Sequence, residues 1–416
     1  MGSAVRVSRR EFVLSSGALG ALLVLPTGGC ASDRIGDRYP GWNPGELDIH
    51  FIHTGVGEQT FFIFPDGTTM LLDCGFVKDR KPGYAEAIPP QPSGRLRGGE
   101  WVARYLKRIT DRREIDYIAV SHWHDDHVMG LGDVAKEFAF RNWTDHQFPG
   151  VGLHNDDADP DTLRFAREFI PAARAKGMKT VPFEVGARGQ FELLNDRFAR
   201  SCRDFEIRNL ASNCVAWDGK GGTVDHATPH IAATGQDKIS ENQLSASMRI
   251  RYGAFTYYTG GDTEGKLIGE DGKVFDWEGR VGAVAGPADV CKTNHHAFWN
   301  AMHAPFVKVV RARVYLSSVW SPNQVSDRNL PIISSRDLYP GERTIYHGFM
   351  PYGKETELAG KPYLSDFSPK RGHQVVKVAP GGRTYEVYTL TAEDESMTVL
   401  DCRRYASRGE GDGHAV

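Results

Sequence analysis

From residue 46 onward, hydrophobic positions first alternate with polar ones and then change to a helical spacing. The stretches LDIHFIHTG and TFFIFPDGTTMLLDCG predict three strands, the last two joined by a turn at Asp66 and Gly67. Apolar positions three or four apart over residues 101–109 predict a helix. The run IDYIAVSH then predicts a buried strand that ends in a polar loop. Strands that give way to a helix and then to another strand are typical of a layered α/β fold.

The second half of the chain shows the same alternation of elements. DPDTLRFAREFIPAARAKG predicts a helix that ends at Gly177, and QLSASMRIRYGAFTYYTGGD predicts a hairpin that turns at Tyr252 and Gly253. ADVCKTNHH predicts a strand, and MHAPFVKVVRARVYLSSVW predicts a helix followed by a strand. HQVVKVAPGGRTYEVYTL predicts a last hairpin.

These elements predict one domain over residues 46–402. Residues 141–240 mix short strands with polar loops, and we expect them to be an insertion or variable region of that domain. Residues 31–45 are predicted to be a loose linker, and residues 403–416 a disordered tail.

Composition limits the classes of function. The chain has 416 residues, 40% of them hydrophobic, which suffices for a normal core. Its formal net charge is −3, so it lacks the broad cationic field that drives non-specific binding to nucleic acids. We expect a small molecule or a phosphodiester as the substrate, and the sequence leaves the oligomeric state open.

The first thirty residues have the form of an export signal. Arg9 and Arg10 lie in SRREF, directly before the apolar segment 12–25, as in twin-arginine signals. That segment is short for a membrane span, which needs ~20 apolar residues, although a plain membrane anchor is the alternative reading. LPTGGC ends in Cys30 and is compatible with lipid attachment, but Thr27 stands where lipoproteins usually carry an aliphatic residue. We therefore expect a periplasmic or cell-envelope protein that touches the membrane only through the signal or a lipid on Cys30.

The cysteines predict a disulfide rather than a zinc–thiolate site. Five cysteines remain after Cys30, none of them in a CxxC pair. Cys202 and Cys214 both lie in a polar, irregular stretch, and they are the most plausible pair in an oxidising compartment.

The stretch SHWHDDHVMG predicts a metal site. It places His122, His124, Asp126 and His127 within six positions directly after the buried strand IDYIAV. Imidazole and carboxylate are common ligands of zinc, manganese and iron. His122 and His124 can serve one ion while Asp126 and His127 serve a second, roughly 3.5–4 Å away, as in two-metal hydrolases.

Two further strand ends supply the remaining ligands. Asp262 closes the strand FTYYTGGD, and its two oxygens are placed to bridge the ions. His295 and His296 close the strand ADVCKTNHH, and the sequence does not distinguish which of the two is the ligand.

The pattern HxHxDH followed by a strand-end Asp and a strand-end His resembles the metallo-β-lactamase superfamily. The finer resemblance is to the ComEC-like branch with its phosphorylcholine esterases, carried by TGVGEQ, SENQLSASMRIRYGAFTYYTGGD and KTNHH over residues 46–300. It implies a four-layer αββα sandwich, here with an insertion and a C-terminal extension. It also implies two divalent ions, zinc before manganese or iron, held by His122, His124, Asp126, His127, Asp262, His295 and His296.

Two departures from that family pattern affect the expected site. Many members carry a third histidine for the first metal before the hairpin of the bridging Asp, whereas this chain has Asn242 there. Water, His226 or His230 are the candidate replacements. The usual HHGS is HHAFWN, so Phe298 and Trp299 either line a substrate pocket with Asn242 or belong to the core.

Other polar residues are expected to be structural. Asp125 either orients a ligand histidine or faces water. Tyr257 and Tyr258 are predicted core residues. The histidines predicted to be structural are His50, His53, His146, His154, His303, His347 and His373.

The expected function is that of an exported, metal-dependent hydrolase that uses a metal-bound hydroxide, most consistently on a phosphoester or phosphodiester. Asp126 is expected to orient the nucleophile. The member of the pair His295–His296 that is not a ligand is expected to assist catalysis, and we assign this role to His296. The alternatives are an acyl hydrolase of the lactonase, thioesterase or β-lactamase type, an iron-dependent sulfur dioxygenase, and a metal-binding envelope protein without turnover.

Overall fold

A computed structural model describes residues 32–77, 90–147, 160–199, 202–234, 239–268, 274–351 and 353–409. The predicted export signal, Cys30 and His154 lie outside these ranges. No helix in the described ranges is long and apolar enough to cross a bilayer.

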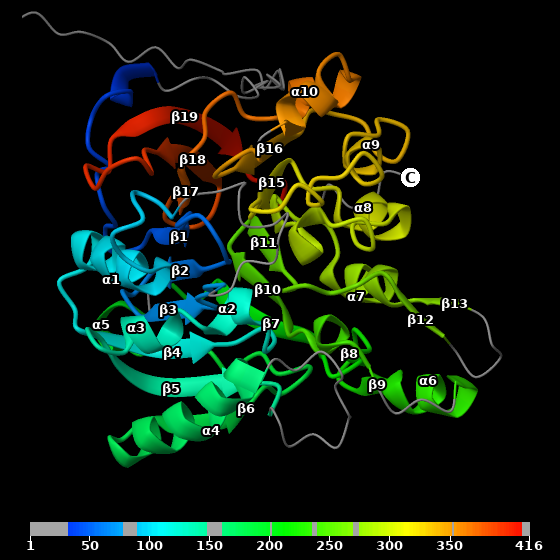
Figure 1. Ribbon diagram of the computed structural model, residues 1–416, viewed down its shortest axis with the longest axis horizontal. Helices are drawn as coiled ribbons and strands as arrows, with labels where there is room; N and C mark the ends of the chain where they lie inside the picture. Colours follow the sequence, from blue (N-terminus) through cyan, green and yellow to red (C-terminus); the bar gives the residue numbers. More distant parts are fainter. Residues whose placement is uncertain are drawn as a thin grey trace, which may run out of the picture.

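Two mixed sheets form the centre of the fold (Figure 1). The first has nine strands in the order β19-β18-β17-β1-β2-β3-β4-β5-β6, in which β3 to β6 are parallel and the other neighbours are antiparallel. Its strands are β1 Leu47–Phe51, β2 Thr60–Ile63, β3 Thr69–Leu72, β4 Glu114–Ala119, β5 Ala139–Asp145, β6 Lys179–Pro182, β17 His373–Val378, β18 Thr384–Leu390 and β19 Val399–Ala406.

The second sheet has eight strands in the order β16-β15-β14-β11-β10-β7-β8-β9, in which β11, β14, β15 and β16 are parallel. Its strands are β7 Phe205–Ser212, β8 Val215–Trp217, β9 Thr223–Asp225, β10 Ser247–Tyr252, β11 Phe255–Thr259, β14 Val290–Lys292, β15 Val314–Ser317 and β16 Thr344–His347. A small separate pair joins β12 Lys266–Ile268 to β13 Val274–Asp276.

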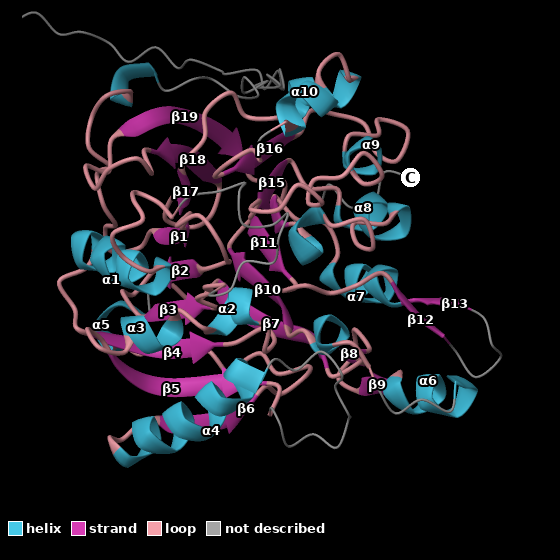
Figure 2. Ribbon diagram, viewed as in Figure 1, coloured by secondary structure: helices cyan, strands magenta, loops and turns pink. Residues whose placement is uncertain are grey.

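Helices cover the outer side of each sheet, as Figure 2 shows on the left and right of the view. Those beside the first sheet are α1 Gly98–Ile109, α2 Asp125–Val128, α3 Leu131–Val134 and α4 Pro160–Ala175, and those beside the second are α7 Trp277–Ala285, α8 Ala304–Val310 and α9 Leu330–Ile333. The remaining helices are α5 Asp196–Ala199, α6 Ala227–Thr234, α10 Lys354–Leu358 and the 3-10 turns η1 Ser32–Arg34, η2 Glu241–Leu244, η3 Asn294–Ala297 and η4 Pro362–Asp366.

Alternation along the strands explains the layers. Leu47, Ile49 and Phe51 of β1 point into the core between the two sheets, where Ile250 and Tyr257 of the second sheet join them. Two further apolar clusters lie between each sheet and its helices. The four-layer αββα sandwich predicted from the sequence is confirmed, and Tyr257 and Tyr258 are fully buried as expected.

Two predicted boundaries differ from the structure. Residues 31–45 are not a loose linker where they are described, because Gly36 and Tyr39 donate backbone hydrogen bonds to Val399 and Met397 beside β19. β19 continues to Ala406, beyond the predicted domain end at residue 402, because it pairs with β18 up to Thr384. Residues 141–240, predicted to be an insertion or variable region, contribute strands to both sheets.

The predicted disulfide is wrong. Cys202 and Cys214 are buried, and they form no disulfide with each other. Cys202 precedes β7 and Cys214 follows it, and eight extended residues at ~3.3 Å each separate the ends of that strand by roughly 26 Å. A disulfide requires Cα atoms within ~7 Å.

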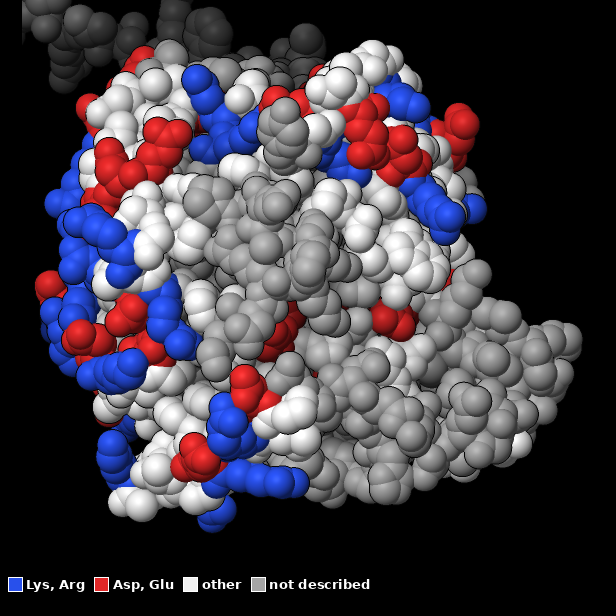
Figure 3. Space-filling view, in the orientation of Figure 1, with Lys and Arg blue, Asp and Glu red and all other residues white. Residues whose placement is uncertain are grey.

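Charges are mixed on the face drawn in Figure 3. Lysines and arginines lie among aspartates and glutamates, chiefly on the side of α1 and near α10. The described part of this face therefore carries no continuous basic surface.

Candidate metal centre

The candidate ligands come from strand ends that meet at one edge of the sandwich. The polar loop after β4 carries His122, His124, Asp126 and His127, the last two in the first turn of α2. β11 and β14 are parallel neighbours, so the residues after them, Asp262 and the pair His295–His296, emerge at the same edge.

A close backbone contact fixes the ligand loop. A Cβ at Gly75 would lie 1.6 Å from the carbonyl oxygen of Asp126, so only glycine lets the turn after β3 pack against α2. The N–H of Glu58 also donates to that carbonyl at 2.8 Å. The glycine of the Asp-x-Gly turn thus positions Asp126.

Four buried side chains converge on one point. Ligand atoms of Asp126, His127, Asp262 and His296 all lie within 4.8 Å of one another. The His296 Nε2 is 3.1 Å from Asp262 Oδ2 and 3.2 Å from Asp126 Oδ2. The His127 Nε2 is 3.3 Å from the same Asp262 oxygen. The structure therefore brings together the predicted second-metal ligands.

The side chains predicted for the first metal are spaced more widely. His122 Nε2 and His124 Nδ1 are 3.2 Å apart. His122 Nε2 lies 3.9 Å from Asp262 Oδ2, and His295 Nε2 lies 3.9 Å from that same oxygen. His122 and His295 thus lie farther from Asp262 than His296 does.

Asp262 faces all of these histidines through one oxygen. Its other oxygen, Oδ1, is 3.4 Å from the Nζ of Lys292, a fully buried lysine that also binds the Glu58 carboxylate at 2.9 Å. Oδ2 therefore faces the histidines directly, whereas Oδ1 also contacts the ammonium group of Lys292.

Carboxylates next to the cluster hold the imidazole rings of the ligand histidines in place. Asp73 Oδ2 is 2.9 Å from His127 Nδ1, and Glu58 Oε2 is 3.3 Å from His296 Nδ1. Such carboxylate–histidine contacts fix the ring and leave Nε2 for a metal. Glu241 Oε1 accepts the Trp123 N–H at 2.7 Å and contacts His146 at 2.6 Å, which anchors the loop between His122 and His124.

The electrostatics of the cluster fit a cation. Burial by itself lowers the pKa of His296, yet Asp262 and Asp126 raise it to about 10. Burial raises the pKa of Asp126, yet His127 and His296 hold it at about 2. Two carboxylates buried this closely need positive charge, which protonated histidines supply here and divalent ions supply equally well. The nitrogen and oxygen donors suit zinc, manganese or iron.

Not every predicted residue joins the cluster. The ring of His226 packs against Trp277 at 5.5 Å between centroids, and the side chain of His230 lies outside the described residues. Asn242 is buried in η2, with its Nδ2 3.3 Å from His295 Nε2. Asp125 accepts the N–H of Asp126 at 2.9 Å, a contact within α2.

Phe298 and Trp299 lie outside the buried core. The Phe298 ring is half-buried, 5.0 Å from His295. Trp299 is 52% exposed, with the Arg328 guanidinium 5.8 Å from its ring. The aromatic side chains thus extend from the ligand loop to the surface.

Three site residues were not singled out in the sequence: Glu58, Asp73 and Lys292. Glu58 and Lys292 belong to motifs of the family resemblance, TGVGEQ and KTNHH, and Asp73 lies near the end of the predicted hairpin TFFIFPDGTTMLLDCG. Their positions within these segments could have identified them as site residues from the sequence.

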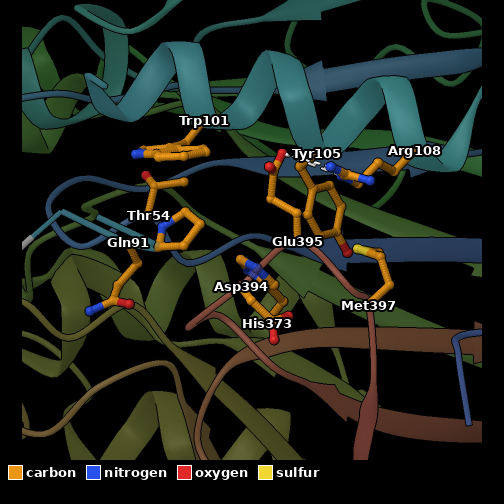
Figure 4. A pocket seen from close by; sticks show the side chains of 10 residues that line it. Thr54, Gln91, Trp101, Tyr105, Arg108, His373, Asp394, Glu395 and Met397 are labelled. Carbon is orange, nitrogen blue, oxygen red and sulfur yellow. Dashed lines mark hydrogen bonds and ion pairs between the residues drawn. The ribbon is translucent and has the colours of Figure 1, made fainter. Parts of the chain in front are cut away.

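A separate pocket lies below α1 (Figure 4). Trp101, Tyr105 and Arg108 reach into it from α1 and face Thr54 and His373. None of the predicted metal ligands lines this pocket, so it is distinct from the metal centre.

Comparisons with known proteins agree with the fold. Residues 53–194 match the model of the metallo-beta-lactamase superfamily. Over these residues the chain is similar to the metallo-beta-lactamase superfamily. The match includes the loop of His122 to His127 but ends before Asp262, His295 and His296, which the fold brings to that loop.

Individual relatives are distant. The chain is 28% identical over 126 residues to lactamase-like protein nscB of Arthroderma otae, covering 30% of this chain and 34% of that protein. CmlA, a diiron beta-hydroxylase from Streptomyces venezuelae, is 12% identical with a TM-score of 0.38, over 81% of this chain and 55% of CmlA. Unliganded yeast PDE1 is 11% identical with a TM-score of 0.38, over 79% of this chain and 98% of PDE1. The chain thus spans about a third of the curated relative and about half of CmlA.

Proposed function

We propose that this protein is an exported hydrolase that depends on two divalent metal ions, zinc by preference, and cleaves a phosphoester or phosphodiester. One observation carries the proposal. Asp126, His127, Asp262 and His296 converge within 4.8 Å in a buried site, with His122 3.9 Å from Asp262 Oδ2 and His124 beside His122.

The candidate ligands form two groups, one for each metal ion. His127, His296 and Asp126 would hold one ion, His122 and His124 would hold the other, and Asp262, whose Oδ2 faces histidines of both groups, would contribute to both. Bound ions of this kind polarise the substrate and lower the pKa of water towards ~7. Asp126 orients the attacking water through its carboxylate, and Glu58 keeps His296 turned towards the site.

The charge of the site supports an anionic substrate. Four buried carboxylates, from Glu58, Asp73, Asp126 and Asp262, are set against the single ammonium of Lys292. Two divalent ions would bring this group slightly above neutrality. A phosphodiester, with one negative charge, matches that balance better than a neutral lactone does, and the Arg328 guanidinium over Trp299 adds positive charge nearby.

Metal analysis combined with a substrate screen tests the function. The purified protein is analysed for bound metal, stripped with a chelator and reloaded with zinc, manganese or iron. Phosphodiester, phosphomonoester, lactone and β-lactam substrates are then assayed. We expect metal-dependent phosphodiester hydrolysis that is lost in Asp262→Ala and kept in His303→Ala, a variant of a histidine that contacts Glu278 instead of the cluster.

Other results would replace this proposal. Cleavage of lactone or β-lactam alone assigns an acyl hydrolase. Bound iron with thiol-dependent oxygen uptake assigns an oxidoreductase, and bound metal without turnover on any substrate assigns a binding protein.

The proposed location is the periplasm or cell envelope. It rests on Arg9 and Arg10 before an apolar segment and on Cys30 as a possible lipid site. Fractionation of cells that express the full chain tests it.

A further inference from the structure

The side chain of His295 is connected in the same way as the ligand histidines. In His127 and His296 the Nδ1 faces a carboxylate oxygen, at 2.9 and 3.3 Å, and the Nε2 faces Asp262 Oδ2. In His122 the Nδ1 contacts the Ser121 hydroxyl at 3.0 Å, again with Nε2 towards Asp262. In His295 the Nδ1 lies 2.7 Å from Asn300 Oδ1, and the Nε2 is 3.9 Å from Asp262 Oδ2.

This contact with Asn300 determines the tautomer. An amide oxygen only accepts hydrogen bonds, so His295 Nδ1 carries the proton and donates it to Asn300. The Nε2 of the neutral ring then carries a lone pair. Its other neighbour, the Asn242 Nδ2 at 3.3 Å, is a donor as well, which also disfavours a proton on Nε2. A histidine that donates a proton to the substrate from Nε2 would instead need the proton on Nε2.

The backbone explains how adjacent histidines reach the same oxygen. His295, His296 and Ala297 have φ values of 44°, 51° and 56°, a left-handed turn that L-residues rarely adopt. The turn places the two rings 6.2 Å apart at the ligand edge, whereas an extended strand would point them to opposite faces. Glu278 holds the loop, because it accepts the N–H groups of Met302 and His303 at 2.7 and 2.8 Å.

We propose that His295 is a ligand of the first metal and replaces the histidine that this chain lacks at Asn242. His296 then serves the second metal, so each of the two adjacent histidines binds a different ion. Asn300 is the positioning residue that fixes the His295 tautomer. The inference rests on the proposed function, because it requires a centre that holds two ions.

Metal stoichiometry tests this assignment without any substrate. The full chain is loaded with zinc, passed through gel filtration and analysed by mass spectrometry for bound metal, and both affinities are measured by chelator competition. Wild type is expected to hold two ions. His295→Ala is expected to keep only one, since loss of a direct ligand should exceed the ~10–100-fold weakening that follows loss of an outer partner.

Three further variants sharpen the test. Asn300→Ala should weaken one ion by ~10–100-fold while the other is unchanged. Asn242→His in the His295→Ala background should restore the second ion, because position 242 lies beside the lost imidazole. His303→Ala, in the same loop, is the matched control and should keep two ions. His295→Gln replaces the Ala variant should the latter fail to fold.

Two results overturn the inference in different ways. If wild type and His295→Ala both hold two ions with equal affinities, His295 is no ligand and the binuclear centre stands. If wild type itself holds fewer than two ions, the proposed centre fails and the assignment fails with it.

Discussion

Glu278 of α7 offers a quantitative test of how the metal-ligand loop is held. Its side chain is fully buried. One carboxylate oxygen accepts the Asn294 side-chain amide at 2.8 Å and the Met302 N–H at 2.7 Å, and the other accepts the His303 N–H at 2.8 Å. These contacts enclose the turn that carries both strand-end histidines. Glu278→Ala removes all three hydrogen bonds at once.

The expected effect follows from the donors that lose their partner. A buried donor left without an acceptor costs ~1–3 kcal/mol. Because 1.4 kcal/mol corresponds to tenfold, the Met302 and His303 amides should exchange with solvent deuterium ~5–150-fold faster in Glu278→Ala. The measurement uses metal-free protein, so that bound ions do not hold the loop, with fragmentation that resolves single amides.

Glu278→Gln is the matched control for this experiment. The side-chain oxygen of the glutamine still accepts a hydrogen bond from the Met302 N–H. Its amide nitrogen is a donor, so it cannot accept from the His303 N–H. Exchange should therefore rise at His303 and change little at Met302. Unchanged exchange at both amides in the Ala variant would refute the idea that Glu278 holds the loop.

Four further predictions concern the centre, export, the substrate and pH. Asp262→Ala should bind neither ion tightly, because its Oδ2 faces ligands of both; two tightly held ions by metal analysis would contradict this. Replacing Arg9 and Arg10 by Lys should leave the protein in the cytoplasm on fractionation, and normal export would exclude a twin-arginine signal. Trp299→Ala should change the Michaelis constant without altering metal content or melting temperature, since the ring is 52% exposed; a clear drop in melting temperature would assign it a packing role. Burial raises the pKa of Glu278 from 4.5 to about 7, so the folded state binds this proton more tightly than the unfolded state does. The free energy of unfolding therefore falls by up to ~3 kcal/mol as the pH rises from 4.5 to about 7. Glu278→Gln should flatten this part of the stability profile in denaturant titrations, and an unchanged profile would contradict that cause.

Local patterns along the sequence determined most of the elements and the kind of site. Alternation predicted the hairpins at Gly67 and Gly253, and helical spacing predicted α1, because burying one face requires a period of two or 3.6. The same logic placed the ligand loop, Asp262 and the strand-end histidines at chain positions where strands stop. These features depend on neighbours within a few residues, which a sequence displays directly.

Contacts between distant segments decided the rest. Lys292 reaches Glu58 across more than two hundred residues, and the same ammonium group also contacts one oxygen of Asp262. The pairing of Gly36 with β19 and the distance along β7 that separates Cys202 from Cys214 are likewise consequences of sheet order and register. These long-range contacts depend on packing energies summed over the whole core. Local periodicity does not determine which strands become neighbours in a sheet. The sequence by itself thus determined which residues could bind metal, and the tertiary structure decided how they are shared between the two halves of the centre.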